Sequence, residues 1–97
     1  MIGGAGFIGS HLVEELLKSD VAEVVVFDNF VAGKPENLAT ALEDPRCRLA
    51  NGNCDIRDFG ALSQAMQGMD GVFHLAALWL LHCQEHPREA FEVNVAG

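Results

Sequence analysis

The glycine-rich opening of the chain constrains its fold more than any other feature. Gly3, Gly4, Gly6 and Gly9 all fall within GGAGFIG, and SHLVEELL follows at once. From residue 7 to about residue 19 the apolar residues recur at helical spacing. A turn of residues without Cβ atoms that leads directly into a helix lets the backbone approach a phosphate group closely. The opening therefore predicts a phosphate-binding turn at the start of an amphipathic helix.

Two glycine spacings overlap in this turn. GxGxxG begins at Gly4, and GxxGxxG begins at Gly3. We expect the N–H groups of Phe7 and Ile8 to point at the oxygens of a pyrophosphate, since the N-terminal end of a helix carries a partial positive charge. Gly9 lies one turn into the helix, where the missing side chain is expected to allow close packing on a sheet.

A strand with an acidic end follows this helix. EVVVFD has no polar alternation, which is typical of a strand buried on both faces. Asp28 ends the run, 19 residues (28 − 9) after Gly9. An acidic residue at about this distance can hydrogen-bond the ribose hydroxyls of a dinucleotide. Its charge repels the 2′-phosphate of NADP, so NAD is the expected cofactor, although Lys34 supplies a nearby cation.

The remaining segments alternate between helix and strand patterns. Three segments have helical patterns: KPENLATALED, with a proline in its first turn; DFGALSQAMQG, between an N-cap at Asp58 and a stop at Gly68; and HPREAFEVNVAG, from Pro87. The two segments between them, CRLANGN and GVFHLAA, are strand-like. This order predicts an α/β, Rossmann-like doubly wound parallel sheet. Residues 1–97 are expected to form a partial NAD(P)-binding Rossmann domain that is truncated at both ends. With its first strand mostly missing, the first helix should lack its main packing surface.

Composition argues against several classes of partner. The chain has 14 acidic and 6 basic residues, so no nucleic-acid partner is expected. The longest apolar run is too short to span a bilayer, and no membrane association is expected. Three cysteines without a CxxC pair favour free thiols in the cytoplasm. His82, Cys83 and His86 lie close together, but Pro87 limits a helix there, so no metal site is expected.

These residues together resemble the extended short-chain dehydrogenase/reductase family, and within it the NAD-dependent epimerase/dehydratase group that acts on nucleotide sugars. The likeness covers essentially the whole chain. GGAGFIGSHLVEELL is similar to the family's opening motif, VVVFDNFVAGKPENL to its second strand with the pair Asp28 and Asn29, CDIRD to its adenine-side loop, VFHLAAL to its fourth-strand motif, and NVAG to its Asn-Val-x-Gly-Thr segment.

The resemblance implies further cofactor-binding residues. Asp55 and Ile56 would contact the adenine. Leu75, Ala76 and Ala77 would form a wall beside the nicotinamide-side ribose and the phosphates, where small side chains leave room for a flat cofactor.

The family's catalytic pair is not found in this chain. The family uses Tyr-x-x-x-Lys, and the sequence contains no tyrosine, so no catalytic residue is assigned. Asn94 is expected to be a scaffold residue. The resemblance implies that the chain is the NAD-binding portion of a nucleotide-sugar epimerase, dehydratase or decarboxylase. On its own the chain is expected to be inactive and to bind NAD weakly, and the parent enzyme is expected to form a homodimer. The alternatives are a non-catalytic dinucleotide sensor or interaction module, and a structural fragment without activity.

Overall fold

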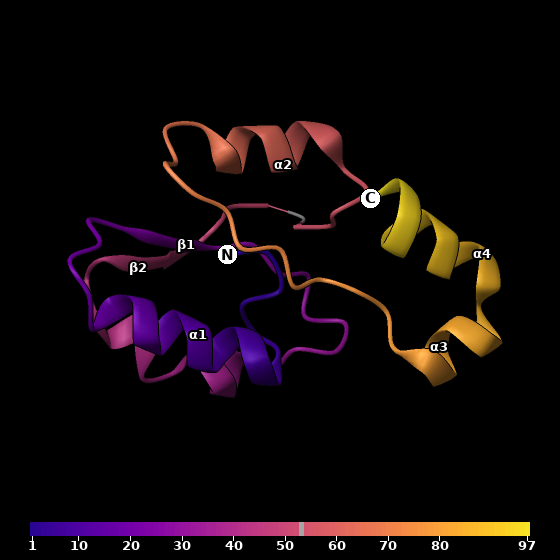
Figure 1. Ribbon diagram of the computed structural model, residues 1–97, viewed down its shortest axis with the longest axis horizontal. Helices are drawn as coiled ribbons and strands as arrows, with labels where there is room; N and C mark the ends of the chain where they lie inside the picture. Colours follow the sequence, from indigo (N-terminus) through magenta and orange to yellow (C-terminus); the bar gives the residue numbers. More distant parts are fainter. Residues whose placement is uncertain (53) are drawn as a thin grey trace.

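A small parallel sheet lies between helices on its two faces (Figure 1). The computed structural model describes residues 1–52 and 54–97. Strand β1 (Val24–Val26) pairs in parallel with β2 (Cys47–Leu49). All three valines of β1 are buried, as a run of β-branched residues without polar alternation predicts. The strand expected over CRLANGN is shorter in the structure: β2 covers its first three residues, the Ala50 N–H still donates to the Val26 carbonyl at 2.8 Å, and Asn53 lies outside the described residues.

The residues just before the glycine turn lie in the centre of this sheet. Ile2 forms parallel bridges to Phe27 on one side and to His74 on the other. Its N–H donates to the Phe73 carbonyl at 2.8 Å, and its carbonyl accepts from the Leu75 N–H at 2.8 Å. The spatial order is therefore β2, β1, Ile2 and the segment around His74. This is the order of a doubly wound sheet, and it confirms the predicted fold class.

Helix α1 (Phe7–Leu17) packs on one face of the sheet. Val13 is completely buried and shares a core with Val24 and Val26 of β1 and with Leu38. The helix begins where the glycine turn ends and stops close to the predicted position. The expectation that it lacks its main packing surface is wrong, because β1 and the segment after β1 supply one.

The segment after β1 differs from the single helix predicted for KPENLATALED. It forms the 3₁₀ helices η1 (Pro35–Leu38) and η2 (Ala41–Glu43). Leu38 and Ala41 are both buried, with 0% and 3% of their surface exposed. Leu38 ends η1 and Ala41 begins η2, so each short helix places one apolar side chain in the core.

Helix α2 (Phe59–Met66) covers the opposite face of the sheet (Figure 1). Ala61 packs there against a second core that includes Phe27. The Asp58 carboxylate accepts a hydrogen bond from the Ala61 N–H at 3.0 Å, which confirms the predicted N-cap. Gly68 follows the helix with a φ of +74°, which confirms the predicted stop.

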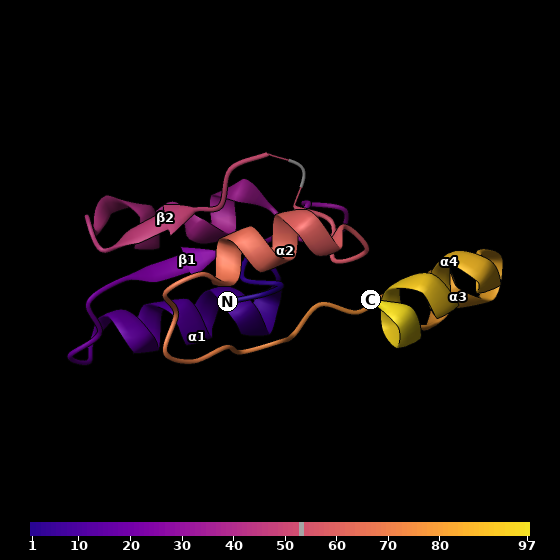
Figure 2. The ribbon, with the colours of Figure 1, turned by 90° about the horizontal axis from the view of Figure 1, so that it is seen from above.

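The last third of the chain departs most from the sequence pattern. The strand expected over GVFHLAA is reduced to the bridge at His74, since among the described residues it pairs with Ile2 alone. Helix α3 (Leu80–Glu85) occupies a stretch for which the sequence pattern predicted neither a helix nor a strand. Helix α4 (Pro87–Phe91) begins at Pro87 as predicted and continues as a π-helical turn, η3 (Glu92–Ala96). Helices α3 and α4 lie together at one end of the molecule, away from the sheet (Figure 2).

No helix in the described part of the chain combines the length and the apolar character needed to cross a bilayer.

Candidate functional site

A hollow of about 120 Å³ lies at the carboxyl edge of the parallel strands. The segments that follow the rows of the sheet meet around it, and Glu89 and Val93 join them from the helical end of the chain. Parallel strands bring their carboxyl ends to the same edge, which is where open α/β sheets bind ligands. The predicted site residues that line this hollow are Gly3, Asp28, Asn29, Asp55, Ile56, Leu75, Ala76 and Ala77.

The glycine turn beside the hollow is closely packed at Gly3 and Gly9 and has more room at Gly6. Gly3 has a φ of +81°, and a Cβ there would lie 2.8 Å from the backbone nitrogen of Ala76. A Cβ on Gly9 would lie 2.1 Å from the Gly3 carbonyl oxygen. Gly9 therefore lets α1 approach the turn itself. At Gly6 a Cβ would meet its nearest neighbour, the same Gly3 oxygen, only at 3.6 Å.

The first turn of α1 presents backbone donors next to Gly6. Gly6 is the N-cap, and no side chain among the described residues caps the helix. The first N–H groups of a helix have no partner within it and carry a partial positive charge. The side chains of Phe7 and Ile8 are 79% and 69% exposed. The predicted site residues that do not line the hollow are Gly6, Phe7, Ile8 and Gly9.

Asp28 links the end of β1 to the glycine turn. Its Oδ2 accepts a hydrogen bond from the Ala5 N–H at 2.9 Å, and its Oδ1 accepts one from the Phe30 N–H at 2.8 Å. Each carboxylate oxygen can accept more than one hydrogen bond, so Asp28 keeps acceptor capacity toward the hollow that it lines. The spacing argument did not include this second role, in which Asp28 holds the turn in place.

Asp55 and Arg57 form an ion pair on the lining of the hollow. The Asp55 carboxylate accepts from Arg57 Nη2 at 2.6 Å and from the Arg57 backbone N–H at 2.9 Å. These hydrogen bonds hold the pKa of Asp55 below its usual value. Sequence reasoning missed Arg57, although CDIRD contains the signal: an arginine two residues after an aspartate can fold back onto it.

Other lining residues have no obvious signature in the sequence. Gly33 lies so close to the turn that a Cβ on it would be 2.7 Å from the Ala5 Cβ. Burial raises the pKa of the Cys54 thiol. Glu89 reaches the hollow from α4, and its hydrogen bond with His82 lowers its pKa. The lining residues that sequence reasoning missed are Ile2, Phe27, Val31, Ala32, Gly33, Cys54, Arg57, Leu78, Glu89 and Val93.

The histidines of α3 are engaged with protein groups. His82 Nε2 lies 2.9 Å from Glu89 Oε2, and the rings of His82 and His86 are 4.9 Å apart. Among the residues that the structure describes, no group of three or more His, Cys, Asp or Glu side chains is arranged to hold a metal ion.

Asn94 attaches the helical end of the molecule to the segment that follows His74. Its Oδ1 accepts from the Leu78 N–H at 2.8 Å, and its Nδ2 donates to the Leu78 carbonyl at 3.1 Å. The side chain thus pairs with the backbone as a neighbouring strand would. Asn94 thus holds two segments of the chain together, as a scaffold residue would.

Comparison with known proteins identifies the family. The family model of the 3-beta hydroxysteroid dehydrogenase/isomerase family matches residues 1–97. The chain belongs to this family. The chain is also similar to nucleotide-sugar epimerases and dehydratases, which confirms the resemblance that the motifs indicated.

Curated relatives of this family member are enzymes of nucleotide sugars. UDP-glucose 4-epimerase of Lacticaseibacillus casei is 38% identical over 100 residues, a match that covers 100% of this chain and 28% of that protein. UDP-glucuronic acid decarboxylase 1 of Arabidopsis thaliana is 35% identical over 97 residues, covering 98% of this chain and 20% of that protein. The chain therefore spans less than a third of the length of these relatives.

Solved structures of the same kind share the fold. The dTDP-glucose 4,6-dehydratase DesIV from Streptomyces venezuelae, with NAD and TYD bound, is 40% identical with a TM-score of 0.86, over 97% of this chain and 31% of that one. The UDP-glucose 4-epimerase of Thermus thermophilus, in complex with NAD, is 37% identical with a TM-score of 0.77, over 97% of this chain and 29% of that one. Both matches support the Rossmann-like assignment.

Proposed function

We propose that residues 1–97 are the NAD-binding part of a nucleotide-sugar epimerase, dehydratase or decarboxylase. The observation that carries this proposal is the meeting of the glycine turn, the Asp28 carboxylate and the small residues Ala76 and Ala77 around one hollow at the carboxyl edge of the sheet. The relatives and the solved structures support it, since they are nucleotide-sugar enzymes and include complexes with NAD.

The phosphate end of the proposed site fits a dinucleotide. A Cβ on Gly6 would make only an ordinary contact, 3.6 Å from the Gly3 carbonyl oxygen, and a β-branched side chain would extend from there into the volume in front of α1. We place the pyrophosphate in that volume, against the backbone N–H groups of Phe7 and Ile8. The turn from Gly3 to Gly9 keeps α1 close enough for these groups to reach it.

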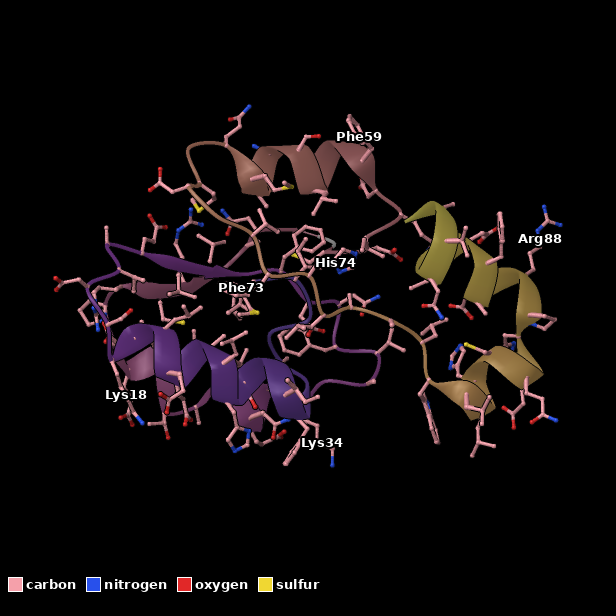
Figure 3. The ribbon with its side chains drawn as sticks, in the orientation of Figure 1. Lys18, Lys34, Phe59, Phe73, His74 and Arg88 are labelled. Atoms are coloured by element: carbon pink, nitrogen blue, oxygen red, sulfur yellow. The ribbon has the colours of Figure 1, made fainter. Side chains whose placement is uncertain are left out.

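The adenosine end is assigned to the charged side of the hollow. Asp28, with Asn29 beside it, accepts hydrogen bonds from the ribose hydroxyls, and its charge favours NAD over NADP. Lys34 is exposed, and Figure 3 shows its side chain directed outward at the edge of the molecule, which supports this preference. Asp55 and Ile56 contact the adenine.

The nicotinamide end lies along the segment after His74. Leu75, Ala76 and Ala77 supply the wall beside the ribose and phosphates on that side. When bound, NAD supplies a reversible hydride acceptor for the sugar, in isomerase or oxidoreductase chemistry. Residues 1–97 contain no tyrosine, so we expect them to hold the cofactor while the acid–base group of the reaction lies outside them.

The setting of the parent enzyme follows from the same proposal. Cys47, Cys54 and Cys83 are free thiols, which supports a reducing, cytoplasmic location. Its substrates are UDP- or dTDP-sugars, and it acts as a homodimer without nucleic acid or membrane. The absence of tyrosine also favours a second candidate, a dinucleotide sensor without catalytic activity. Although the family is named for a steroid activity, we propose a nucleotide-sugar substrate for the parent enzyme, because the curated relatives are enzymes of nucleotide sugars.

Calorimetric titration of the chain with NAD tests the proposed site. Gly6→Val should weaken NAD binding at least about tenfold, because the branched side chain fills the space assigned to the pyrophosphate. Gly71→Val is the matched control, since a Cβ on Gly71 has no neighbour within 4 Å and Gly71 does not line the hollow. Equal affinities of Gly6→Val and the unmodified chain would contradict the proposal.

Turnover distinguishes the cofactor-binding part from a complete enzyme. The chain is incubated with NAD and a panel of UDP-, GDP- and dTDP-sugars, and the products are analysed. We expect no conversion above a control without protein. Conversion would mean that residues 1–97 contain an acid–base group that the sequence argument overlooked.

A further inference from the structure

We propose that Asn37 is a positioning residue of the cofactor site, which fixes the Ala5 peptide so that the glycine turn is already formed when the dinucleotide arrives. This inference rests on the proposed NAD site. It concerns a residue that is outside the lining of the hollow and that reaches the ligand only through Ala5.

The Ala5 residue is held on both of its peptide groups. Its carbonyl oxygen accepts from Asn37 Nδ2 at 2.9 Å and from the Lys34 N–H at 3.1 Å. Its N–H donates to Asp28 Oδ2 at 2.9 Å. Ala5 itself is completely buried. All of these partners belong to the segment that follows β1, so one segment clamps the middle of the glycine turn.

The turn needs such a clamp because of its composition. Glycines have more conformational freedom in the unfolded chain than other residues, so ordering a glycine-rich turn costs more entropy. A turn that must order while it binds subtracts that cost from the affinity. The Gly6 N–H has only a long hydrogen bond of 3.4 Å, to the Gly3 carbonyl. The contacts that hold Ala5 therefore come from outside the turn.

Asn37 is itself held firmly enough to act as a fixed donor. It lies in η1 directly before Leu38, and the Leu38 side chain is completely buried. The Asn37 backbone N–H donates to the Lys34 carbonyl at 3.0 Å, which sets the start of η1. Gly33 allows this segment to lie against Ala5, because any Cβ there would collide with the Ala5 Cβ at 2.7 Å. The buried anchor and the close approach together aim the Asn37 amide at the turn.

Asn37 can be tested separately from the other two partners. Lys34 contributes a backbone group that substitution does not remove, and Asp28 belongs to the proposed ribose site. Asn37→Ala removes the donor. Asn37→Asp keeps the shape of the side chain but replaces the donor by a charged acceptor that faces the Ala5 carbonyl. Gln64→Glu, on the exposed side of α2, is the matched control for the added charge.

Amide hydrogen exchange and NAD titration are measured on the full chain and on each variant. Loss of one hydrogen bond should raise the exchange rates of the Ala5 and Lys34 amides about 3- to 10-fold and weaken NAD binding by a similar factor. The Leu62 amide, which donates to the Asp58 carbonyl in α2, should exchange at its original rate. Gln64→Glu should change none of these values.

Each other result overturns the inference in a recognisable way. Unchanged exchange at Ala5 and Lys34 would show that Asn37 does not hold the turn. Faster exchange at Leu62 to the same extent would show a general structural role. Faster local exchange with unchanged NAD affinity would show that holding the turn does not position it for the cofactor. If the unmodified chain binds no NAD, the proposed function fails instead, and the exchange data still decide whether the clamp exists.

Discussion

Gly9 and Gly60 are both helical glycines, yet replacing them by alanine should change the free energy of unfolding in opposite directions. In α1, a Cβ on Gly9 would lie 2.1 Å from the Gly3 carbonyl oxygen and 2.9 Å from the Gly4 Cα. In α2, a Cβ on Gly60 would meet only the Asp58 carboxylate oxygen, at 3.5 Å. The first position has no room for a methyl group, and the second has an ordinary contact.

The expected magnitudes follow from these distances. Alanine in place of a helical glycine stabilises a protein by about 0.5–1 kcal/mol, because the unfolded chain loses less conformational freedom on folding. Gly60→Ala should retain this gain. At Gly9 the colliding atoms belong to the backbone, so α1 or the glycine turn must move, and overpacking of this kind costs about 1–3 kcal/mol. The net effect of Gly9→Ala should be a loss of up to about 2 kcal/mol.

Urea denaturation followed by circular dichroism measures both effects on the same chain. Gly9→Ala should lower the denaturation midpoint, and Gly60→Ala should raise it. Gly9→Ala should also weaken NAD binding, because the shifted turn is the proposed pyrophosphate site. A Gly9→Ala variant as stable as the original protein would contradict this prediction, because a Cβ at position 9 would then cost no free energy where α1 approaches the turn.

Three further predictions concern charged side chains. Asp28→Ala should lower the affinity for NAD more than the affinity for NADP, so that the ratio of the two affinities measured by calorimetry falls about tenfold, or about 1.4 kcal/mol. Equal affinities for NAD and NADP in the original protein would rule out a role of Asp28 in selecting NAD. Arg57 holds the pKa of Asp55 in the folded chain below its unfolded value of about 3.9. The ionised Asp55 therefore stabilises the fold fully above about pH 3.9, and this stabilisation is lost as the pH falls through the pKa of Asp55 in the folded chain. Asp55→Asn should therefore flatten the acid limb of unfolding free energy against pH, and an unchanged limb would argue against the ion pair. Arg46 caps the end of α1 by donating to the carbonyls of Leu17, its last residue, and of Ser19 and Val21 beyond it, so Arg46→Ala should lower the free energy of unfolding in urea by about 1–3 kcal/mol. Arg48→Ala, which removes the exposed ion pair with Glu23, should lower it by less than about 1 kcal/mol. Similar losses for both variants would contradict the capping role of Arg46.

Much of the local structure could be predicted from the sequence because it depends on neighbouring residues. The glycine turn passes into a helix at Phe7, and the valine run of β1 is buried on both faces. Asp58 caps α2, and Gly68 ends it in the left-handed conformation. These features follow from capping, backbone freedom and burial of β-branched residues, which act over a few positions of the chain.

The position of much of the candidate site could also be predicted, because the parallel order fixes which segments meet. Once β1, Ile2 and the segment around His74 are neighbours in a parallel sheet, Asp28 and Ala76 must come to the same edge. The separation between Gly9 and Asp28 carried this information in the sequence. The structure brings the two segments together by a hydrogen bond between Asp28 and Ala5 that the spacing alone did not reveal.

Features that depend on distant partners in the chain could not be predicted from the sequence. The segment after β1 forms two short 3₁₀ helices where one helix was expected, and it packs Leu38 and Ala41 into the core that α1 and β1 share. Glu89 reaches the hollow through the packing of α4, and Asn37 finds the Ala5 carbonyl across 32 positions of the chain. Local propensity cannot specify such contacts, because the free energy that selects them comes from surfaces that meet only in the folded chain. Local sequence thus fixes where the turn and its helix lie, and the packing of the segment after β1 sets how the turn is held.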